Sequence, residues 1–113
     1  MIIAEEFSSW SKNLKVKDIP EKTRFTLRFL LKDICGIILS ARNEDYVKSL
    51  VESYKGSGNL ISLGHSERFD LFSSAIIAGT AAHGEDFDDT FEGNPMHIGA
   101  TMIPAMLSAA QKF

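Results

Sequence analysis

The chain has 113 residues, 44% of them hydrophobic, and its twelve basic and fifteen acidic side chains give a formal net charge of −3. This length suits one domain with a modest core, and the slight acidity argues against a nucleic-acid partner. The single cysteine excludes an intrachain disulfide, and without an apolar leader or an apolar run of about 20 residues we expect a cytoplasmic protein with no membrane span.

Hydrophobic spacing predicts an all-α fold with about five helices, forming a single helical domain over residues 1–113. In the first helix, residues 2–14, the apolar side chains share one stripe, and we expect Trp10 to anchor it in the core. The second helix follows Pro20, and its apolar residues are so numerous that it should be the central buried helix. They are Phe25, Leu27, Phe29, Leu30, Leu31, Ile34, Ile37, Ile38 and Ala41.

Three shorter helices are expected in the rest of the chain. Asn43 can cap the third helix, which has a one-sided apolar face and ends at Gly56. Ser66 is the favoured cap of the fourth helix, whose many Ala, Ser and Gly residues suit close packing. The fifth lies within residues 98–110 and should begin near residues 101–104.

Residues 79–97 hold most of the side chains that could carry chemistry. They include five acids and two histidines: Glu85, Asp86, Asp88, Asp89, Glu92, His83 and His97. No Lys or Arg occurs between Arg68 and Lys112. Like charges this close repel, so these acids need water, shared protons, a cation, or basic residues from elsewhere.

Short motifs in this acidic segment match three unrelated chemistries. Residues 86–90 match Asp-x-Asp-x-Thr, but an aspartyl nucleophile of that kind needs a preceding buried strand, which is not expected here. An EF-hand beginning at Asp86 would have Phe91 where the loop requires Gly and His97 where it requires Glu. A magnesium motif, Asp88-Asp89-x-x-Glu92, stays open as a minor alternative.

A longer ordered set of residues points to a family. The set is Ala78-Gly79-Thr80-Ala81-Ala82-His83-Gly84-Glu85-Asp86-Phe87-Asp88-Asp89-Thr90, then His97, then Pro104-Ala105. It resembles the signature of the MmgE/PrpD family, which includes 2-methylcitrate dehydratase, cis-aconitate decarboxylase and iminodisuccinate epimerase. The resemblance implies the amino-terminal part of a large helical domain and a lyase that acts on small polycarboxylates.

Five residues are the candidates for the site. His97 is the best general acid or base, because imidazole titrates near neutral pH. The resemblance implies that Asp86 and Thr90 position His97 or contact the substrate, and it adds Asp89 and His83 as substrate-binding candidates. His83 also suits a structural role, as a cap that hydrogen-bonds the acidic loop.

No cofactor is expected, and no metal either, because the sequence lacks a compact ligand set such as two histidines at i and i+4. The helical pattern runs to the last residues without a terminator, which suggests a truncated chain that self-associates as a homodimer or joins a complementing polypeptide. The alternative function is a helical self-association or partner-binding module without catalysis.

Overall fold

The computed structural model describes residues 2–113 and confirms the all-α prediction. Five α-helices and one 3₁₀ helix follow one another: α1 (Ile3–Asn13), η1 (Val16–Asp18), α2 (Glu21–Ala41), α3 (Asp45–Tyr54), α4 (Leu71–His83) and α5 (Ile98–Lys112). Within the described residues, none of these helices is both long enough and apolar enough to cross a membrane.

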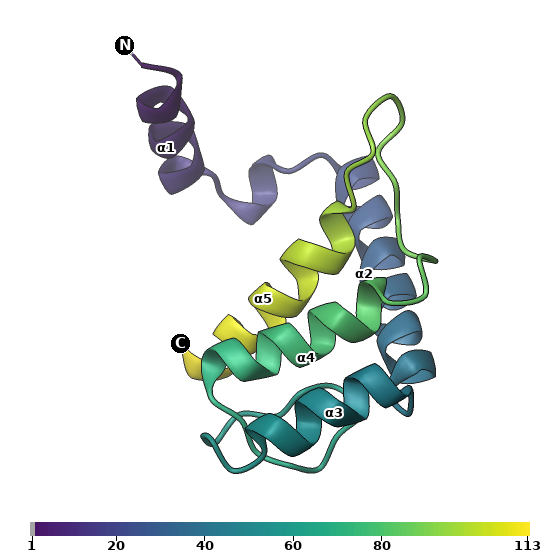
Figure 1. Cartoon of the computed structure of the whole chain (residues 1–113). Coiled ribbons are helices and arrows are strands. Elements are labelled where there is room, and N and C mark those ends of the chain that lie inside the picture. Colours follow the sequence, from purple (N-terminus) through teal and green to yellow (C-terminus); the bar gives the residue numbers. More distant parts are fainter. Residues whose placement is uncertain (1) are drawn as a thin grey trace.

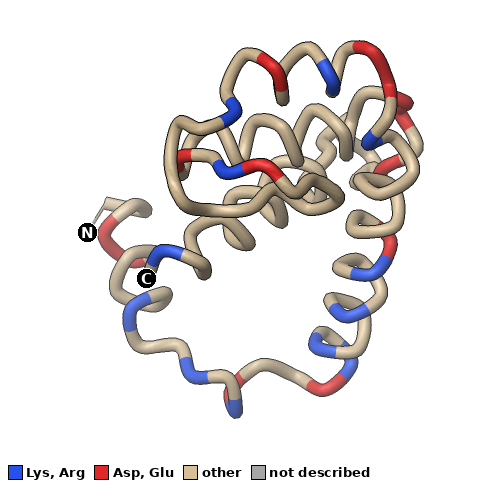
Figure 2. Tube along the Cα trace, turned by 90° about the horizontal axis from the view of Figure 1, so that it is seen from below, with Lys and Arg blue, Asp and Glu red and all other residues tan. Residues whose placement is uncertain are grey.

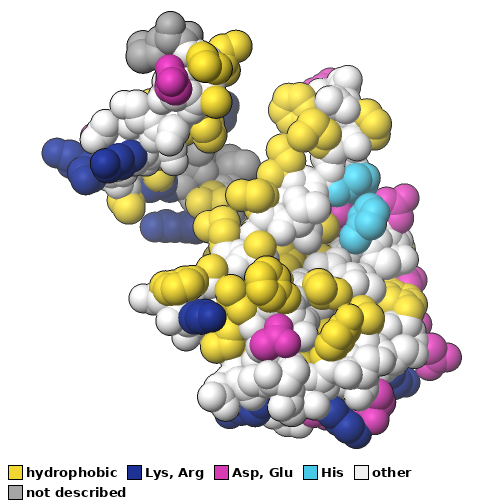
Figure 3. All heavy atoms as spheres, turned by 60° about the vertical axis from the view of Figure 1, so that its left-hand side comes forward, with side chains coloured by type: hydrophobic (Ala, Val, Ile, Leu, Met, Phe, Trp, Pro, Cys, Tyr) yellow, Lys and Arg dark blue, Asp and Glu magenta, His cyan; other side chains and the backbone are white. Residues whose placement is uncertain are grey.

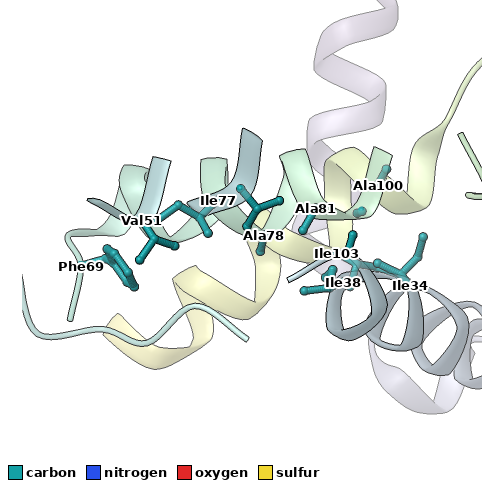
Figure 4. Packing of buried hydrophobic residues seen from close by; sticks show 12 residues of the cluster. Ile34, Ile38, Val51, Phe69, Ile77, Ala78, Ala81, Ala100 and Ile103 are labelled. Atoms are coloured by element: carbon teal, nitrogen blue, oxygen red, sulfur yellow. The ribbon is translucent and has the colours of Figure 1, made fainter. Parts of the chain in front are cut away.

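Helices α4 and α5 form the centre of the fold. They lie side by side, while α2 crosses one end of the pair and α3 flanks α4 (Figure 1). The buried side chains of α4 are small or of moderate size, which lets its neighbours approach closely: Ser73, Ser74, Ile77, Ala78, Ala81 and Ala82. Figure 4 shows Ile34 and Ile38 of α2 lying against the region where Ala81 meets α5.

The first helix and half of the second lie outside this core. Trp10 is 57% exposed and α1 buries no residue, so the expected core anchor is wrong. In α2 only Ile34, Ile38 and Ala41 are buried, which corrects the expectation of a central buried helix. The physical reason is placement, because α1 and the start of α2 extend away from the α4–α5 pair (Figure 1). Most of their large apolar side chains are exposed.

Two predicted caps are also wrong. Glu44, not Asn43, is the N-cap residue of α3. Helix α4 begins at Leu71, where Asp70 accepts hydrogen bonds from the Ser73 backbone N–H and hydroxyl, and not near Ser66. Helix α4 starts later than predicted because Leu60 and Phe69 exchange two backbone hydrogen bonds, of 2.9 and 2.8 Å. These bonds keep the chain extended up to Phe69.

The last helix starts earlier than its sequence suggests. Helix α5 begins at Ile98, several residues before the predicted start at residues 101–104, and continues through Pro104. This earlier start places His97 directly at the helix amino terminus, which matters for the site.

The core predicts a contrast between two residues of α2. Ile38→Ala should lower the free energy of unfolding by about 2–5 kcal/mol, because Ile38 is fully buried and its removal leaves a cavity. Leu27→Ala, at an exposed position of the same helix, should change it by less than about 1 kcal/mol. Urea denaturation followed by circular dichroism measures both, and equal losses would contradict the described core.

Candidate active site

The loop between α4 and α5 brings two histidines together. His83 is the last residue of α4 and His97 is the N-cap residue of α5. Their rings lie with centroids 4.7 Å apart at an interplanar angle of 57°. Figure 3 shows histidine side chains at the surface beside acidic ones, and His97 is the more enclosed, with 26% of its side chain exposed against 55% for His83.

A buried carboxylate lies between these rings. The Asp88 side chain is 0% exposed. Its Oδ2 atom lies 3.2 Å from Nδ1 of His83 and 3.2 Å from Nδ1 of His97, and its Oδ1 atom is 3.1 Å from Nδ1 of His83. The His83 contact has hydrogen-bond geometry, whereas the buried Nδ1 of His97 has no aligned hydrogen-bond partner. Asp88 therefore contacts both histidines from the buried side of the cluster.

Asp86 completes the cluster from the solvent side. Its backbone has φ of 56°, in the left-handed region that Asp tolerates better than most residues. In this turn its N–H donates to the carbonyl of His83 at 2.9 Å, and its Oδ1 lies 3.9 Å from Nε2 of His97. One ligand-type atom from each of His83, Asp86, Asp88 and His97 can be chosen so that all four lie within 4.8 Å of one another.

Asp89 points away from this cluster and caps α5. Its Oδ1 accepts a hydrogen bond of 2.9 Å from the backbone N–H of Gly99, while the N-cap residue His97 provides no side-chain cap of its own. A Cβ atom at Gly99 would collide with the Asp89 carboxylate and press on Ile34. Glycine at this position thus lets the acidic loop fix the start of the helix that carries His97.

Tyr46 of α3 supports the other end of the loop. Its hydroxyl donates to Glu85 at 2.8 Å, and its ring lies where a Cβ atom of Gly84 would be. Desolvation and the hydrogen bond to Glu85 raise the pKa of Tyr46 to about 12. Sequence reasoning missed this contact, because 39 residues separate the two side chains and no local pattern links them.

An open groove of about 710 Å³ runs along the exposed side of the α4–α5 pair. Both histidines line it, together with Ile76, Gly79, Thr80, Gly84, Ala100 and Thr101. Within residues 2–113 no Lys or Arg contributes to its lining. Figure 2 shows the basic residues elsewhere, mainly along the amino-terminal arm, α2 and the neighbourhood of α3. The groove offers imidazole, a hydroxyl and apolar surface, without permanent positive charge.

Comparison with known proteins agrees with the resemblance seen in the sequence. The model of the MmgE/PrpD N-terminal domain matches residues 5–113. The chain belongs to the MmgE/PrpD family. A curated relative, the cis-aconitate decarboxylase-like protein oryM of Aspergillus oryzae (strain ATCC 42149 / RIB 40), is 26% identical over 113 residues. The alignment covers 96% of this chain but only 23% of that relative, and no solved structure matches.

In this MmgE/PrpD chain the five expected site residues fall into two groups. His83, Asp86 and His97 come together around Asp88. Asp89 is engaged at the start of α5, and Thr90 is exposed and outside the four-residue cluster. The sequence identified both histidines by residue type, but Asp88 could not be told apart from its acidic neighbours.

The two aromatic residues between the acids do not pack the loop against the core. Phe87 and Phe91 are both exposed. The magnesium motif is not assembled either: within the described residues Asp88 faces the histidines, Asp89 caps α5 and Glu92 is exposed. The loop is held by backbone turns, among them the 3.0 Å bond from the Phe91 N–H to the Met96 carbonyl.

Two glycine substitutions should have opposite effects on stability. Gly99→Ala should lower the free energy of unfolding by about 1 kcal/mol or more, because the new methyl group displaces the Asp89 cap. Gly36→Ala, in an open position of α2, should raise it by about 0.5–1 kcal/mol, as Ala does in an exposed helix. Denaturant titrations compare the two, and stabilisation by both would refute the capping role of Asp89.

The Tyr46 contact predicts a change of stability with alkaline pH. Because the folded state raises the Tyr46 pKa to about 12, from an ordinary value of about 10, the contact stabilises the fold fully below pH about 10. That contribution is lost as pH rises towards about 12. Tyr46→Phe should therefore destabilise the chain at pH 8 and lose this effect in strong alkali. Urea titrations at several pH values measure it; a constant difference would contradict the contact.

Proposed function

We propose that this chain forms the histidine-bearing part of an MmgE/PrpD-type lyase site for small polycarboxylates such as 2-methylcitrate or cis-aconitate. The observation that carries the proposal is the position of His97 on the groove, with one ring nitrogen against the buried carboxylate of Asp88. Family membership and the decarboxylase-like relative support the class of reaction.

His97 is the proposed proton donor or acceptor. Its Nε2 atom lies 3.9 Å from Asp86, on the exposed side of the ring, while Nδ1 faces Asp88. When the ring takes up a proton, the fully buried Asp88 carboxylate offsets the charge in a setting where water screens little. Asp86 is the proposed positioner of the ring, and His83 lines the groove as a substrate-binding candidate. The roles that the resemblance implies for Asp89 and Thr90 stay predictions, since neither residue lines the groove.

The complete activity should require cations from outside these residues. A polycarboxylate in the groove would meet no Lys or Arg of the described chain, and the exposed carboxylate of Asp86 lies beside the His97 ring. Stabilising the charge that develops beside a carboxylate takes preorganised positive charge or donors. Proton transfer alone provides only about 10²–10⁴-fold acceleration. We therefore propose that a complementing polypeptide supplies the basic side chains.

A second candidate function is a self-associating or partner-binding helical module without catalysis. The exposed apolar side chains of α1 and α2 favour it: Ile3, Phe7, Trp10, Phe25 and Phe29. Exposed apolar surface of this kind is common at protein interfaces. Light scattering combined with an activity assay separates the two functions, because only the enzyme proposal requires turnover when the missing polypeptide is present.

The enzyme proposal predicts activity only on complementation. The purified chain alone should not turn over 2-methylcitrate or cis-aconitate at an ordinary enzymatic rate, which is about 1–10³ s⁻¹. With a polypeptide supplying the rest of an MmgE/PrpD domain, turnover should appear, and His97→Gln should reduce it by about 100-fold or more.

His65→Gln is the matched control for that experiment, because His65 lies outside the cluster and the groove. It should leave the complemented rate unchanged. An ordinary rate from the chain alone, or full activity of the complemented His97→Gln variant, would overturn the assignment. Circular dichroism checks that both variants fold.

A further inference from the structure

We propose that His83, Asp86, Asp88 and His97 form a binding site for one first-row divalent transition-metal ion, of which zinc fits best. The proposal goes beyond the lyase function and does not depend on it, since metal binding can be measured without turnover. It also reverses the expectation from sequence that no metal would bind.

The distances within the cluster match those between ligands of a single ion. Zinc bonds to imidazole nitrogen or carboxylate oxygen are about 2.0–2.2 Å long, so tetrahedral ligands lie about 3.4 Å apart. The Nδ1 atoms of His83 and His97 are each 3.2 Å from the same oxygen, Oδ2 of Asp88. Asp86 lies on the open side as the fourth ligand, and one ligand atom from each of the four residues lies within 4.8 Å of the other three.

The geometry at His97 favours a shared ion over a simple hydrogen bond. Its Nδ1 atom is buried and 3.2 Å from an Asp88 oxygen, yet that oxygen is not aligned to accept an N–H bond. Two ligands of one ion approach each other in this way, because each directs its lone pair at the metal and not at its neighbour. Coordination would give this nitrogen a partner, and the ion would replace the hydrogen bond that Nδ1 of His83 makes to Asp88.

The negative charge of the cluster also favours a bound metal ion. A fully buried carboxylate is costly unless it is paired, and no Lys or Arg lies between Arg68 and Lys112. Two imidazoles and two carboxylates form a donor set that suits zinc and similar borderline ions. Magnesium and calcium prefer oxygen ligands throughout, so they should bind far more weakly.

Equilibrium dialysis of the full chain against zinc, in excess magnesium and with metal measured by elemental analysis, tests the proposal. One zinc ion should bind per chain. His83→Gln should weaken binding by roughly 100-fold or more, since losing even an outer-shell partner costs 10–100-fold. Its side chain is half exposed, so the variant should fold, which circular dichroism confirms.

A pair of charge-matched variants separates a built site from general attraction to acids. Asp88→Asn and Glu92→Gln each remove one negative charge from the same loop, but only Asp88 belongs to the cluster. Asp88→Asn should abolish specific binding, while Glu92→Gln and His65→Gln should retain it. Equal weakening by Asp88→Asn and Glu92→Gln would overturn the proposal, as would zinc binding that His83→Gln leaves unchanged or the absence of bound zinc.

Two further measurements give independent readouts of the same site. Cobalt bound in place of zinc should show the intense visible absorption of a tetrahedral complex in the wild-type chain and in Glu92→Gln, but not in His83→Gln. Zinc should also raise the unfolding temperature of the first two proteins only, because an ion that binds the folded state stabilises it. A failed lyase assay would leave these outcomes unaffected, so the two proposals can fail separately.

Discussion

The buried carboxylate of Asp88 connects the parts of the molecule that matter for its chemistry. It contacts the last residue of α4 and the N-cap residue of α5, so the two ends of the loop between these helices are held at one buried side chain. An unpaired buried charge would be costly, whereas one paired with two imidazoles is tolerated. The orientation of both histidines therefore depends on a carboxylate that makes no contact with solvent.

The contact at Asp88 is possible only because the central helices pack closely. Alanines and serines on the buried face of α4 let α5 approach, and α2 closes the end of the pair with Ile34 and Ile38. Gly99 adds to this closeness, since its missing side chain leaves room for the Asp89 cap beside Ile34. The close packing of the helices thus determines the geometry of the loop. A change in either should displace His97.

The sequence predicted what depends on local pattern and missed what depends on contacts between distant segments. Apolar periodicity was enough for the five helices, and residue type singled out His83 and His97. The start of α4 was misplaced because the Leu60–Phe69 pairing is not visible in a local window. Asp88 was indistinguishable from the other acids, because the turn at Asp86 determines which carboxylate faces inward. Burial of Trp10 failed because a periodic stripe does not specify a packing partner.

Because Lys and Arg of the described residues are absent from the groove lining, the kind of ligand that the site favours depends on whether another polypeptide adds basic residues. By itself, the cluster of two aspartates and two histidines attracts a cation and repels an anionic substrate. If basic side chains from another polypeptide line the groove, the local potential changes sign and a polycarboxylate becomes the better ligand. A metal ion on Nδ1 and a polycarboxylate near Nε2 would then use opposite sides of the His97 ring, and their opposite charges would favour joint binding. The loop thus fixes the orientation of His97, whereas the ligand that His97 meets depends on which positive charge is supplied to the groove.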